Sequence, residues 1–519
     1  MNALISVIPI ALLFALMLGF KVTSWKSALA TLIVTIVLGM LVAPAIGLVP
    51  AAFAGAPVGE LVWWSFVEGV LKAVFPILII ILMAIYSYNV LVASGQIEVI
   101  KQQFTSFTTD RGVLVLMMVW GFGGLLEGMA GFGTAVAIPA AILIGLGFKP
   151  MFSALVALLG NTVATGFGAV GVPVTTLCNE VAPNGAASAE AIAQISAFSV
   201  VQLSPLFILI PFVILMLTDR SKWKTNLLLA LWVGGVSLAV QYVCARYLGA
   251  ETPAILGSIA AIVAIIAYAR VFSPRKKGEA TDSKPLSAGA ALKAWSVYLF
   301  ILAAILLSGA LCPPVNAFLK SHLVSAVNIP VIGTTFKFGW ISNAGLKLFV
   351  GTVAGGLVQG LSPRRLAEVL ASTIVNLRFT SVTIISLIAL ASVMNYTGMI
   401  ASMASGLVAV TGGLYPLFAP LIGAVGTFVT GSDTSSNILF AKLQANVAGQ
   451  LGLTDTDTDW LVAANTTGAT GGKMISPQSI AIATAACHME GRDDAILRQA
   501  LPYALAYIAI GGLVVYFGL

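Results

Sequence analysis

Residues 161–168 read Asn-Thr-Val-Ala-Thr-Gly-Phe-Gly, and residues 465–472 read Asn-Thr-Thr-Gly-Ala-Thr-Gly-Gly. A proline follows each stretch, Pro173 after the first and Pro477 after the second. Each stretch interrupts an apolar segment that is long enough to cross a bilayer. A helix broken at that depth persists only where it lines an enclosed cavity or binds a solute. The two stretches therefore predict two broken membrane helices and an internal repeat.

The composition around these stretches is that of a membrane protein. The chain has 519 residues, of which 59% are hydrophobic and only 9% are charged, and its mean hydropathy is +1.03. Soluble domains contain about 25% charged residues, so a soluble protein is excluded. Runs of about 20 apolar residues predict twelve spans, at 3–20, 27–49, 74–94, 150–178, 190–217, 226–247, 252–271, 294–312, 339–360, 366–395, 460–487 and 496–519.

Two further apolar stretches, 113–148 and 414–449, are too long for one span, and small and polar residues interrupt each near its middle. Residues 123–134 read GGLLEGMAGFGT, and residues 426–437 read GTFVTGSDTSSN. Both stretches are typical of re-entrant hairpins. Their acidic residues, Glu127 and Asp433, are separated by nearly the same distance along the chain as the two Asn-Thr breaks. This agreement strengthens the prediction of a repeat.

The Lys and Arg residues between the spans predict the orientation of the chain. Loops with several basic residues, such as 220–224 and 270–277, should be cytoplasmic, and the segments 179–189 and 450–459 should face outward. The spans satisfy this scheme only if the two hairpins point at each other. We therefore expect an all-α polytopic membrane protein with about 12 transmembrane helices and two re-entrant hairpins, arranged as two inverted repeats with broken helices. The predicted parts are 1–217 for the first repeat, 218–293 for linking helices and a charged cytoplasmic loop, and 294–519 for the second repeat.

Several functions are excluded by what the chain lacks. The net charge of +7 comes from short basic clusters between apolar runs, which is a topological pattern and not a nucleic-acid-binding face. The two histidines and four separated cysteines offer no zinc site, and neither another metal nor a cofactor is expected. Gly166–Gly171 matches GxGxxG, but no strand precedes it. Walker A, GxSxG and HExxH motifs are missing, so we expect neither an ATP-driven pump nor an enzyme.

The breaks supply the first candidate binding residues. Half-helix N-termini carry partial positive charge and free N–H groups, which favour an anion. Side chains that can bind at the breaks are Asn161, Thr162 and Thr165 in the first, and Asn465, Thr466 and Thr470 in the second. The alternative is that these side chains only cap the broken helix ends.

Charged residues within the membrane are the second set. A charge at the bilayer centre costs about 2.5–3.5 kcal/mol, so it usually marks a pathway or an ion pair. Lys473 and Arg378 are possible countercharges for an anionic substrate. Glu127 and Asp433 are possible proton carriers, because burial favours the protonated form of a carboxyl. The alternative is two internal salt bridges. Glu68 and Lys72, four residues apart, are interpreted as a pair on one helix face.

Four motifs of the sequence resemble the bacterial L-lactate permease family over nearly the whole chain. They are residues 127–134, 160–168, 430–437 and 473–479. The resemblance implies import of L-lactate, and often of glycolate or other short 2-hydroxymonocarboxylates, with protons across the bacterial inner membrane. We also expect Ser432, Ser435 and Asn437 of the second hairpin to bind the substrate.

More distantly, the paired hairpins and breaks resemble dicarboxylate and citrate carriers, many of which use sodium. Those carriers tend to have Ser-Asn-Thr at both hairpins and both breaks. Here Gly160 and Ala464 precede the Asn-Thr pairs, which argues against sodium coupling.

Our sequence-based hypothesis is a proton-coupled symporter of monocarboxylates that spans the lipid bilayer. A sodium-coupled carrier of di- or tricarboxylates is the second interpretation. A gated anion channel is less compatible, because the polar residues concentrate at two facing zones and form no continuous pore. The oligomeric state and the order of lactate and glycolate preference are left open.

Overall fold

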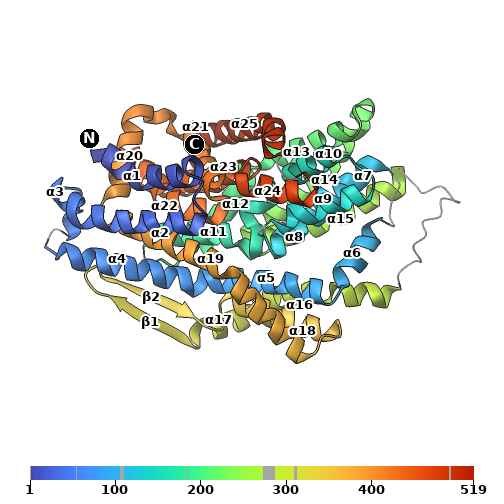
Figure 1. The fold of residues 1–519 in the computed structure, drawn as a ribbon, viewed down its shortest axis with the longest axis horizontal. Coiled ribbons are helices and arrows are strands. Elements are labelled where there is room, and N and C mark those ends of the chain that lie inside the picture. Colours follow the sequence, from blue (N-terminus) through green and yellow to red (C-terminus); the bar gives the residue numbers. More distant parts are fainter. Residues whose placement is uncertain are drawn as a thin grey trace.

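The computed structural model describes residues 2–53, 55–105, 110–131, 133–183, 185–272, 287–308, 312–489 and 492–519, which are almost entirely helical (Figure 1). The helices of the first half are α1 Asn2–Phe14, α2 Ser24–Val37, α3 Ala43–Ala45, α4 Val58–Lys72, α5 Ile79–Ala93, α6 Gln96–Thr105, α7 Arg111–Leu116, α8 Gly123–Met129, α9 Thr134–Gly145, α10 Pro150–Gly160, α11 Gly168–Val181, α12 Ala189–Gln202, α13 Ser204–Thr218, α14 Trp223–Leu248 and α15 Pro253–Phe272.

The second half contains ten α-helices and one pair of strands in its described residues. These elements are α16 Ala288–Ser308, α17 Pro313–Ser321, β1 Val324–Ile329, β2 Thr334–Gly339, α18 Ala344–Val358, α19 Pro363–Tyr396, α20 Met399–Thr411, α21 Tyr415–Thr430, α22 Asp433–Gln450, α23 Asp455–Lys473, α24 Pro477–Ala486 and α25 Asp493–Phe517. The charged linker predicted at 273–293 lies mainly outside the described residues, at 273–286.

The described residues contain nine helices long and apolar enough to cross a membrane, or up to eleven if each of two bent pairs counts as one span. The prediction of an all-α polytopic membrane protein is therefore confirmed, with somewhat fewer full-length spans than the twelve expected. One reason is α18 in the span predicted at 339–360, which has only 15 residues. The inverted relation of the two halves stays a prediction.

At each of the two stretches predicted as hairpins, two helices meet at a tight turn. In the first, α7 and α8 lead into α9 through Gly131 and Gly133, whose φ angles are +63° and +84°. In the second, α21 and α22 meet at Gly431, with φ +71°. Glycine adopts these left-handed conformations without strain because it has no Cβ, whereas other residues do not, which explains glycine at the turns.

The first broken helix is present where the sequence predicts it. Helices α10 and α11 are separated by the turn at 161–167 and bent by 46°. Ala169, Val170 and Gly171, at the start of α11, have left-handed φ angles.

The second break differs from the prediction. Helix α23 continues through Asn465–Thr470, and the interruption falls at 474–476, before α24. Neighbouring helices explain this difference, because their side chains satisfy the polar groups that we expected at a break. Gly468 also lets α23 approach α21 so closely that a Cβ there would clash with the carbonyl of Pro420.

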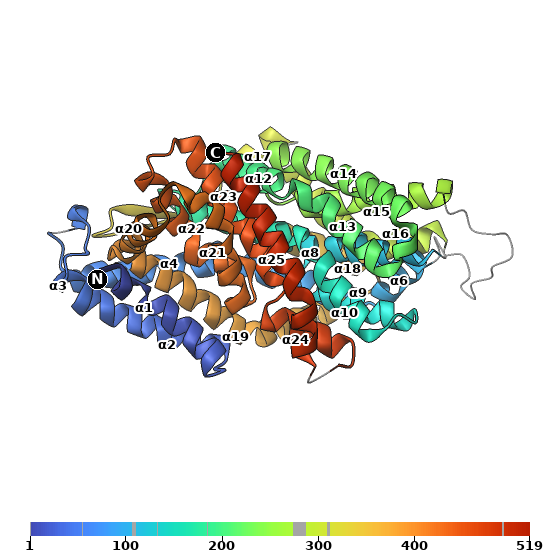
Figure 2. The same cartoon turned by 90° about the horizontal axis from the view of Figure 1, so that it is seen from above.

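Two groups of helices lie against each other. The central bundle comprises α7–α11 and α21–α24, whose hairpin tips and breaks meet near its middle. The flank comprises α2, α4, α5, α16, α18 and α19, and α4, α5, α16, α18 and α19 lie along the lower side of the molecule in Figure 1. From above, α25 crosses over α21 and α23, which it contacts (Figure 2).

A β-hairpin that the sequence did not predict covers part of the flank. Strands β1 and β2 are antiparallel, with Val324 opposite Gly339. Phe338 of β2 packs on Phe75, just after α4, with ring centres 5.2 Å apart. The hairpin thus protects the end of α4.

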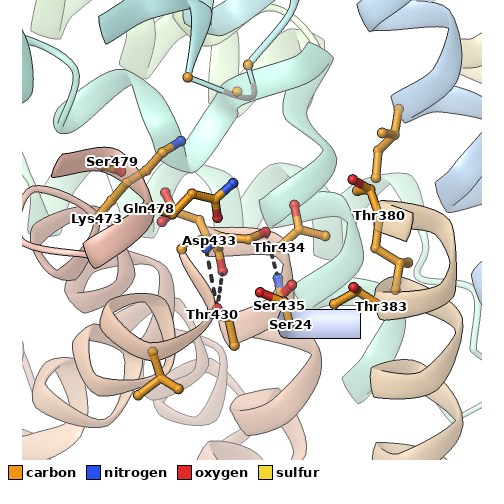
Figure 3. Close-up of a pocket in the computed structure, with 18 of the residues that line it drawn as sticks. Ser24, Thr380, Thr383, Thr430, Asp433, Thr434, Ser435, Lys473, Gln478 and Ser479 are labelled. Carbon is orange, nitrogen blue, oxygen red and sulfur yellow. Dashed lines mark hydrogen bonds between the residues drawn. The ribbon is translucent and has the colours of Figure 1, made fainter. Parts of the chain in front are cut away.

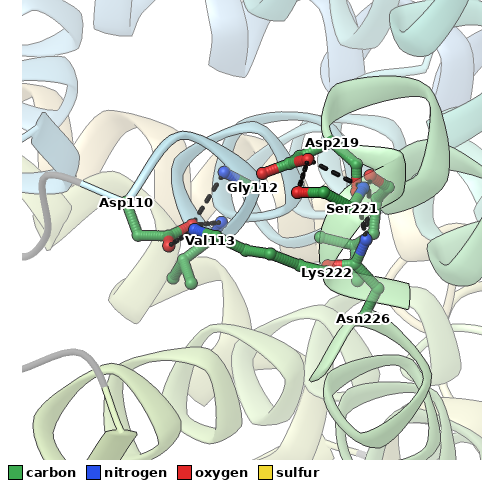
Figure 4. Close-up of polar contacts among 8 residues, drawn as sticks. Asp110, Gly112, Val113, Asp219, Ser221, Lys222 and Asn226 are labelled. Atoms are coloured by element: carbon green, nitrogen blue, oxygen red, sulfur yellow. Dashed lines mark hydrogen bonds and ion pairs between the residues drawn. The ribbon is translucent and has the colours of Figure 1, made fainter. Parts of the chain in front are cut away.

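The basic loop between α13 and α14 is tied to the start of α7 (Figure 4). Lys222 donates from Nζ to Asp110 Oδ2 at 3.0 Å, and Asp110 Oδ1 accepts the N–H groups of Gly112 and Val113 at the start of α7. Asp219 caps the loop by accepting from the N–H and hydroxyl of Ser221.

Candidate functional site

A cavity of about 480 Å³ lies between the tips of the central bundle and the flank helices α2 and α19. Figure 3 shows Asp433, Thr434 and Ser435 between Lys473 and Gln478 on one side and Thr380 and Thr383 on the other. The polar residues that line it from the central bundle are Glu127, Thr165, Thr430, Ser432, Asp433, Thr434, Ser435, Lys473, Gln478 and Ser479.

An ion pair joins the first hairpin to the second broken helix. Lys473 Nζ lies 2.9 Å from Glu127 Oε1, and both side chains are largely buried. The backbone of Gly168 packs against this carboxyl, because a Cβ at Gly168 would lie 2.6 Å from Glu127 Oε1. A larger residue at the start of α11 would therefore push the Glu127 carboxyl aside.

Asp433 stands next to this pair without a comparable partner. Its residue exposure is 3%, yet no described residue makes a hydrogen bond of good geometry to either carboxylate oxygen. The hydroxyls of Thr165 and Thr427 lie close to the carboxyl. Buried carboxylates are normally paired or hydrogen-bonded. An unsatisfied one beside a cavity indicates a place where a proton or a ligand binds.

Three helix N-termini surround the cavity. The residues at the start of α9, α22 and α24 all contribute to its lining, through Gly133, Asp433 and Gln478 respectively. Ser432 Oγ accepts the N–H of Ser435 at 3.2 Å, and Ser476 Oγ accepts that of Ser479 at 3.2 Å. The positive ends of these helices favour a bound anion.

The opposite wall belongs to the flank and was missed by the sequence-based prediction. Ser24 and Trp25 of α2 and Phe379, Thr380 and Thr383 of α19 line it. The Trp25 and Phe379 rings stack with centres 5.3 Å apart. Aromatic and hydroxyl residues are common in apolar helices, so the sequence does not mark them as functional. The spacing of Thr380 and Thr383 by nearly one helical turn is the one pattern that could have indicated this wall.

The candidate residues are distributed in three places. Thr165, Ser432, Ser435, Lys473, Glu127 and Asp433 line the cavity. Arg378 is not among the lining residues; its guanidinium lies 4.7 Å from the centre of the Phe379 ring. The remaining six, Asn161, Thr162, Asn437, Asn465, Thr466 and Thr470, are buried and absent from the lining. A role for each in binding stays a prediction.

A hydrogen-bonded network links three of these six buried residues, Asn437, Asn465 and Thr466. Asn437 Nδ2 donates to Thr466 Oγ1 and to the carbonyl of Pro173, each at 2.9 Å. Asn465 Nδ2 donates to Asn437 Oδ1 at 2.9 Å. The network thus joins α22 and α23 to α11 and supports the cavity from behind.

No group of three or more potential metal-ligating His, Cys, Asp or Glu side chains occurs in the part of the chain that the structure describes. Among the described residues, the polar side-chain groups that line the cavity are hydroxyls, the Trp25 indole N–H, one amide and three ionisable groups.

The whole chain has relatives of known name. A sequence model of the family described as L-lactate permease matches residues 2–518. The chain belongs to the L-lactate permease family. It is 38% identical over 393 residues to the L-lactate permease of Streptococcus iniae, which covers 74% of this chain and 80% of that protein. It is 32% identical both to the glycolate permease GlcA and to the L-lactate permease of Escherichia coli K12, over 99% of this chain and 95% of each relative.

Two solved transporters share the fold at low sequence identity. The YdaH transporter of Alcanivorax borkumensis has a TM-score of 0.54 at 13% identity, covering 94% of this chain and 98% of that one. MtrF of Neisseria gonorrhoeae has a TM-score of 0.53 at 14% identity, covering 94% of each chain. Membership of the permease family and the apolar helices together identify a multi-pass membrane transporter.

Proposed function

We propose that this chain imports L-lactate, and also glycolate and other short 2-hydroxymonocarboxylates, with protons across the bacterial inner membrane. The names of its relatives support this substrate class. The observation that carries the proton coupling is Asp433, a buried carboxyl that has no ion-pair partner and no hydrogen bond of good geometry among the described residues, beside the Glu127–Lys473 ion pair.

Charge balance explains how proton and substrate would be coupled. Among the described residues, Glu127, Asp433 and Lys473 are the ionisable groups that line the cavity, and the first and last neutralise each other. An ionised Asp433 would repel an incoming carboxylate, because two like charges would meet at a buried position. Protonation of Asp433 removes that repulsion, so the proton and the monocarboxylate bind together.

The substrate is expected to lie between the two walls of the cavity. Its carboxylate faces Lys473 and the N-termini of α22 and α24, which supply positive charge. Its 2-hydroxyl meets hydroxyl side chains such as those of Thr380 and Thr383, and its methyl group packs on Phe379. Glycolate lacks only that methyl group, so the same site accepts both acids.

Uptake into proteoliposomes under separately imposed gradients tests the proposal. An inward proton gradient without sodium should drive accumulation of radiolabelled L-lactate, with glycolate but not citrate as a competitor. Accumulation driven only by a sodium gradient at equal pH would contradict proton coupling and favour a sodium-coupled carrier. Rapid flux without counterflow would favour a channel.

A further inference from the structure

A second cluster of buried charge lies outside the cavity and has no part in the coupling proposed above. It consists of Glu68 and Lys72 on α4, Glu180 on α11 and Lys442 on α22, which we call the outer quartet. Each of the four side chains is at most 10% exposed. Glu180 is therefore not a loop residue facing outward, as the sequence suggested, but a buried member of this cluster.

Each ion pair of the outer quartet joins two residues of the same group of helices, one pair in the flank and the other in the central bundle. Lys72 Nζ lies 3.0 Å from Glu68 Oε1 on the same flank helix. Lys442 Nζ lies 3.4 Å from Glu180 Oε2, and both residues belong to the central bundle. Among the described residues, no ion pair joins Glu68 to Lys442 or Lys72 to Glu180. Each side of the interface is therefore neutral by itself.

Each pair is also anchored to its own group. Ser392 and Tyr396 of α19 donate to the two oxygens of Glu68, at 2.6 and 3.0 Å, so the first pair is fixed within the flank. Helix α11, which carries Glu180, packs along α22, and Asn437 Nδ2 of α22 donates to the carbonyl of Pro173 in α11.

Contacts across the interface are longer than the ion pairs, although Lys72 attracts Glu180 and Lys442 attracts Glu68 across it. Lys442 Nζ lies 5.7 Å from the centre of the Tyr396 ring, a cation–π contact between the central bundle and the flank. Lys72 and Glu180 line a small cavity of about 150 Å³ that also touches β2. The two pairs thus face each other without exchanging partners.

This arrangement has a physical consequence for motion. An ion pair that crossed the interface would leave two uncompensated buried charges when the groups separated, at a large cost. Two internally neutral pairs leave none. They attract each other through dipoles and the Tyr396 ring, so they stabilise one alignment of the two groups without locking it.

We propose that the outer quartet positions the central bundle against the flank in the state where the substrate cavity is assembled, and releases it when the transporter changes state. The inference rests on the proposed transport function. It applies because one wall of the cavity belongs to α22, the helix of Lys442 and Asp433, and the other wall belongs to α19, the helix of Tyr396. A shift of α22 along α19 would therefore separate the two walls of the cavity and, at the same time, move Lys442 away from the Tyr396 ring.

The experiment removes the central-bundle pair without stranding a charge. The double variant Glu180→Gln/Lys442→Met stays neutral, and L-lactate uptake is measured in proteoliposomes under an inward proton gradient. Fewer molecules should occupy the cavity-forming state, so KM should rise by about threefold to tenfold while Vmax stays within about twofold of wild type. An unchanged KM would overturn the inference.

Two substitutions at one position provide the matched control. Tyr396→Leu removes the ring that faces Lys442, and KM should rise in the same direction as in the double variant. Tyr396→Phe keeps the ring and loses only the hydroxyl bonded to Glu68 within the flank, so KM should stay at the wild-type value. Equal KM values for the two would contradict the role of the ring and with it the inference. Wild-type protein that takes up no L-lactate would contradict the proposed function as well.

Discussion

The central cavity and the outer quartet both bury charge between the same two groups of helices, but they match that charge differently. In the cavity, Lys473 faces two carboxyls and forms an ion pair with only one of them, Glu127. Asp433 therefore has no ion-pair partner among the described residues. In the outer quartet, two lysines meet two glutamates, and Ser392 and Tyr396 satisfy Glu68 further.

The difference separates a site that binds from a site that positions. A cluster with one carboxyl in excess is improved by a proton or a cation, so it responds to a ligand. A balanced and hydrogen-bonded cluster gains nothing from either, and it serves to set the alignment of helices. Burial alone does not distinguish the two, because every charged residue in both clusters is largely buried.

The strongest way to break the comparison is to unbalance the outer quartet. Lys442→Met leaves Glu180 buried without its partner, and removal of one partner from a buried pair costs about 3–5 kcal/mol of unfolding free energy. Thermal unfolding in detergent should show this loss. The double variant Glu180→Gln/Lys442→Met should recover most of it. A single variant as stable as wild type would mean that the quartet is not a balanced structural cluster.

The cavity should respond to the opposite change. Asp433→Asn keeps the shape of the side chain and removes its proton chemistry, so uptake driven by a proton gradient should fall about 100-fold, the scale for loss of a proton-transferring group. Thermal stability should be near wild type, since no hydrogen bond from a described residue is lost. Lactate-dependent proton uptake at the wild-type level would remove Asp433 from the coupling.

Much of the cavity could be predicted from the sequence, because a charged residue within the membrane has a high free-energy cost. Charged residues inside apolar stretches are expensive, so Glu127, Asp433 and Lys473 were recognisable as candidates, and the structure brings them to one cavity. The same signal was available at Lys442, inside the hairpin predicted at 414–449. Its partner Glu180 was not recognisable, because it lies at the end of an apolar segment and was assigned to a loop.

Other features depend on tertiary contacts that sequence patterns do not contain. The break expected at Asn465–Thr470 is wrong because Asn437, Gln444 and Tyr507 satisfy these side chains from neighbouring helices. The Trp25–Phe379 wall consists of residues that are ordinary in any membrane helix. The strands β1 and β2 lie almost entirely in the short segment between the spans predicted at 294–312 and 339–360, for which the sequence predicts no secondary structure.

A steric substitution sharpens the comparison inside the cavity itself. Gly168→Ala has an acceptable backbone conformation, with φ −64° and ψ 158°, but its Cβ would displace the Glu127 carboxyl from Lys473. Displacement of the carboxyl also moves its partner Lys473 in the cavity, and a loss of about 1.4 kcal/mol of binding free energy would raise KM for L-lactate about tenfold. Gly235→Ala, in the middle of α14 with open space around its Cβ, is the matched control and should leave KM unchanged. Equal KM values in both variants would show that the position of Glu127 does not matter for binding.

The smallest effect is expected where charge is exposed, at the contact of Lys222 with Asp110, and it sets the scale for both buried clusters. The hydrogen bond to Asp110 and its negative charge raise the pKa of Lys222 above the ordinary 10.5. A raised pKa in the folded state stabilises the protein below pH 10.5, and this stabilisation is lost as pH rises through the folded-state value. Hydrogen bonds from Ser221 lower the pKa of Asp219, so its contribution is instead lost in acid, as pH falls below 3.8.

Lys222→Ala should therefore lower the unfolding free energy at neutral pH by at most about 1 kcal/mol, because half of this side chain faces solvent and water screens the pair. The difference from wild type should shrink in thermal unfolding measured above pH 10.5. Lys224→Ala, in the first turn of α14, removes a charge that lies beside the Trp223 ring and serves as the control. A loss of unfolding free energy as large as that of Lys442→Met would show that solvent exposure does not weaken this pair. Burial would then no longer explain the larger effects expected at the cavity and at the outer quartet.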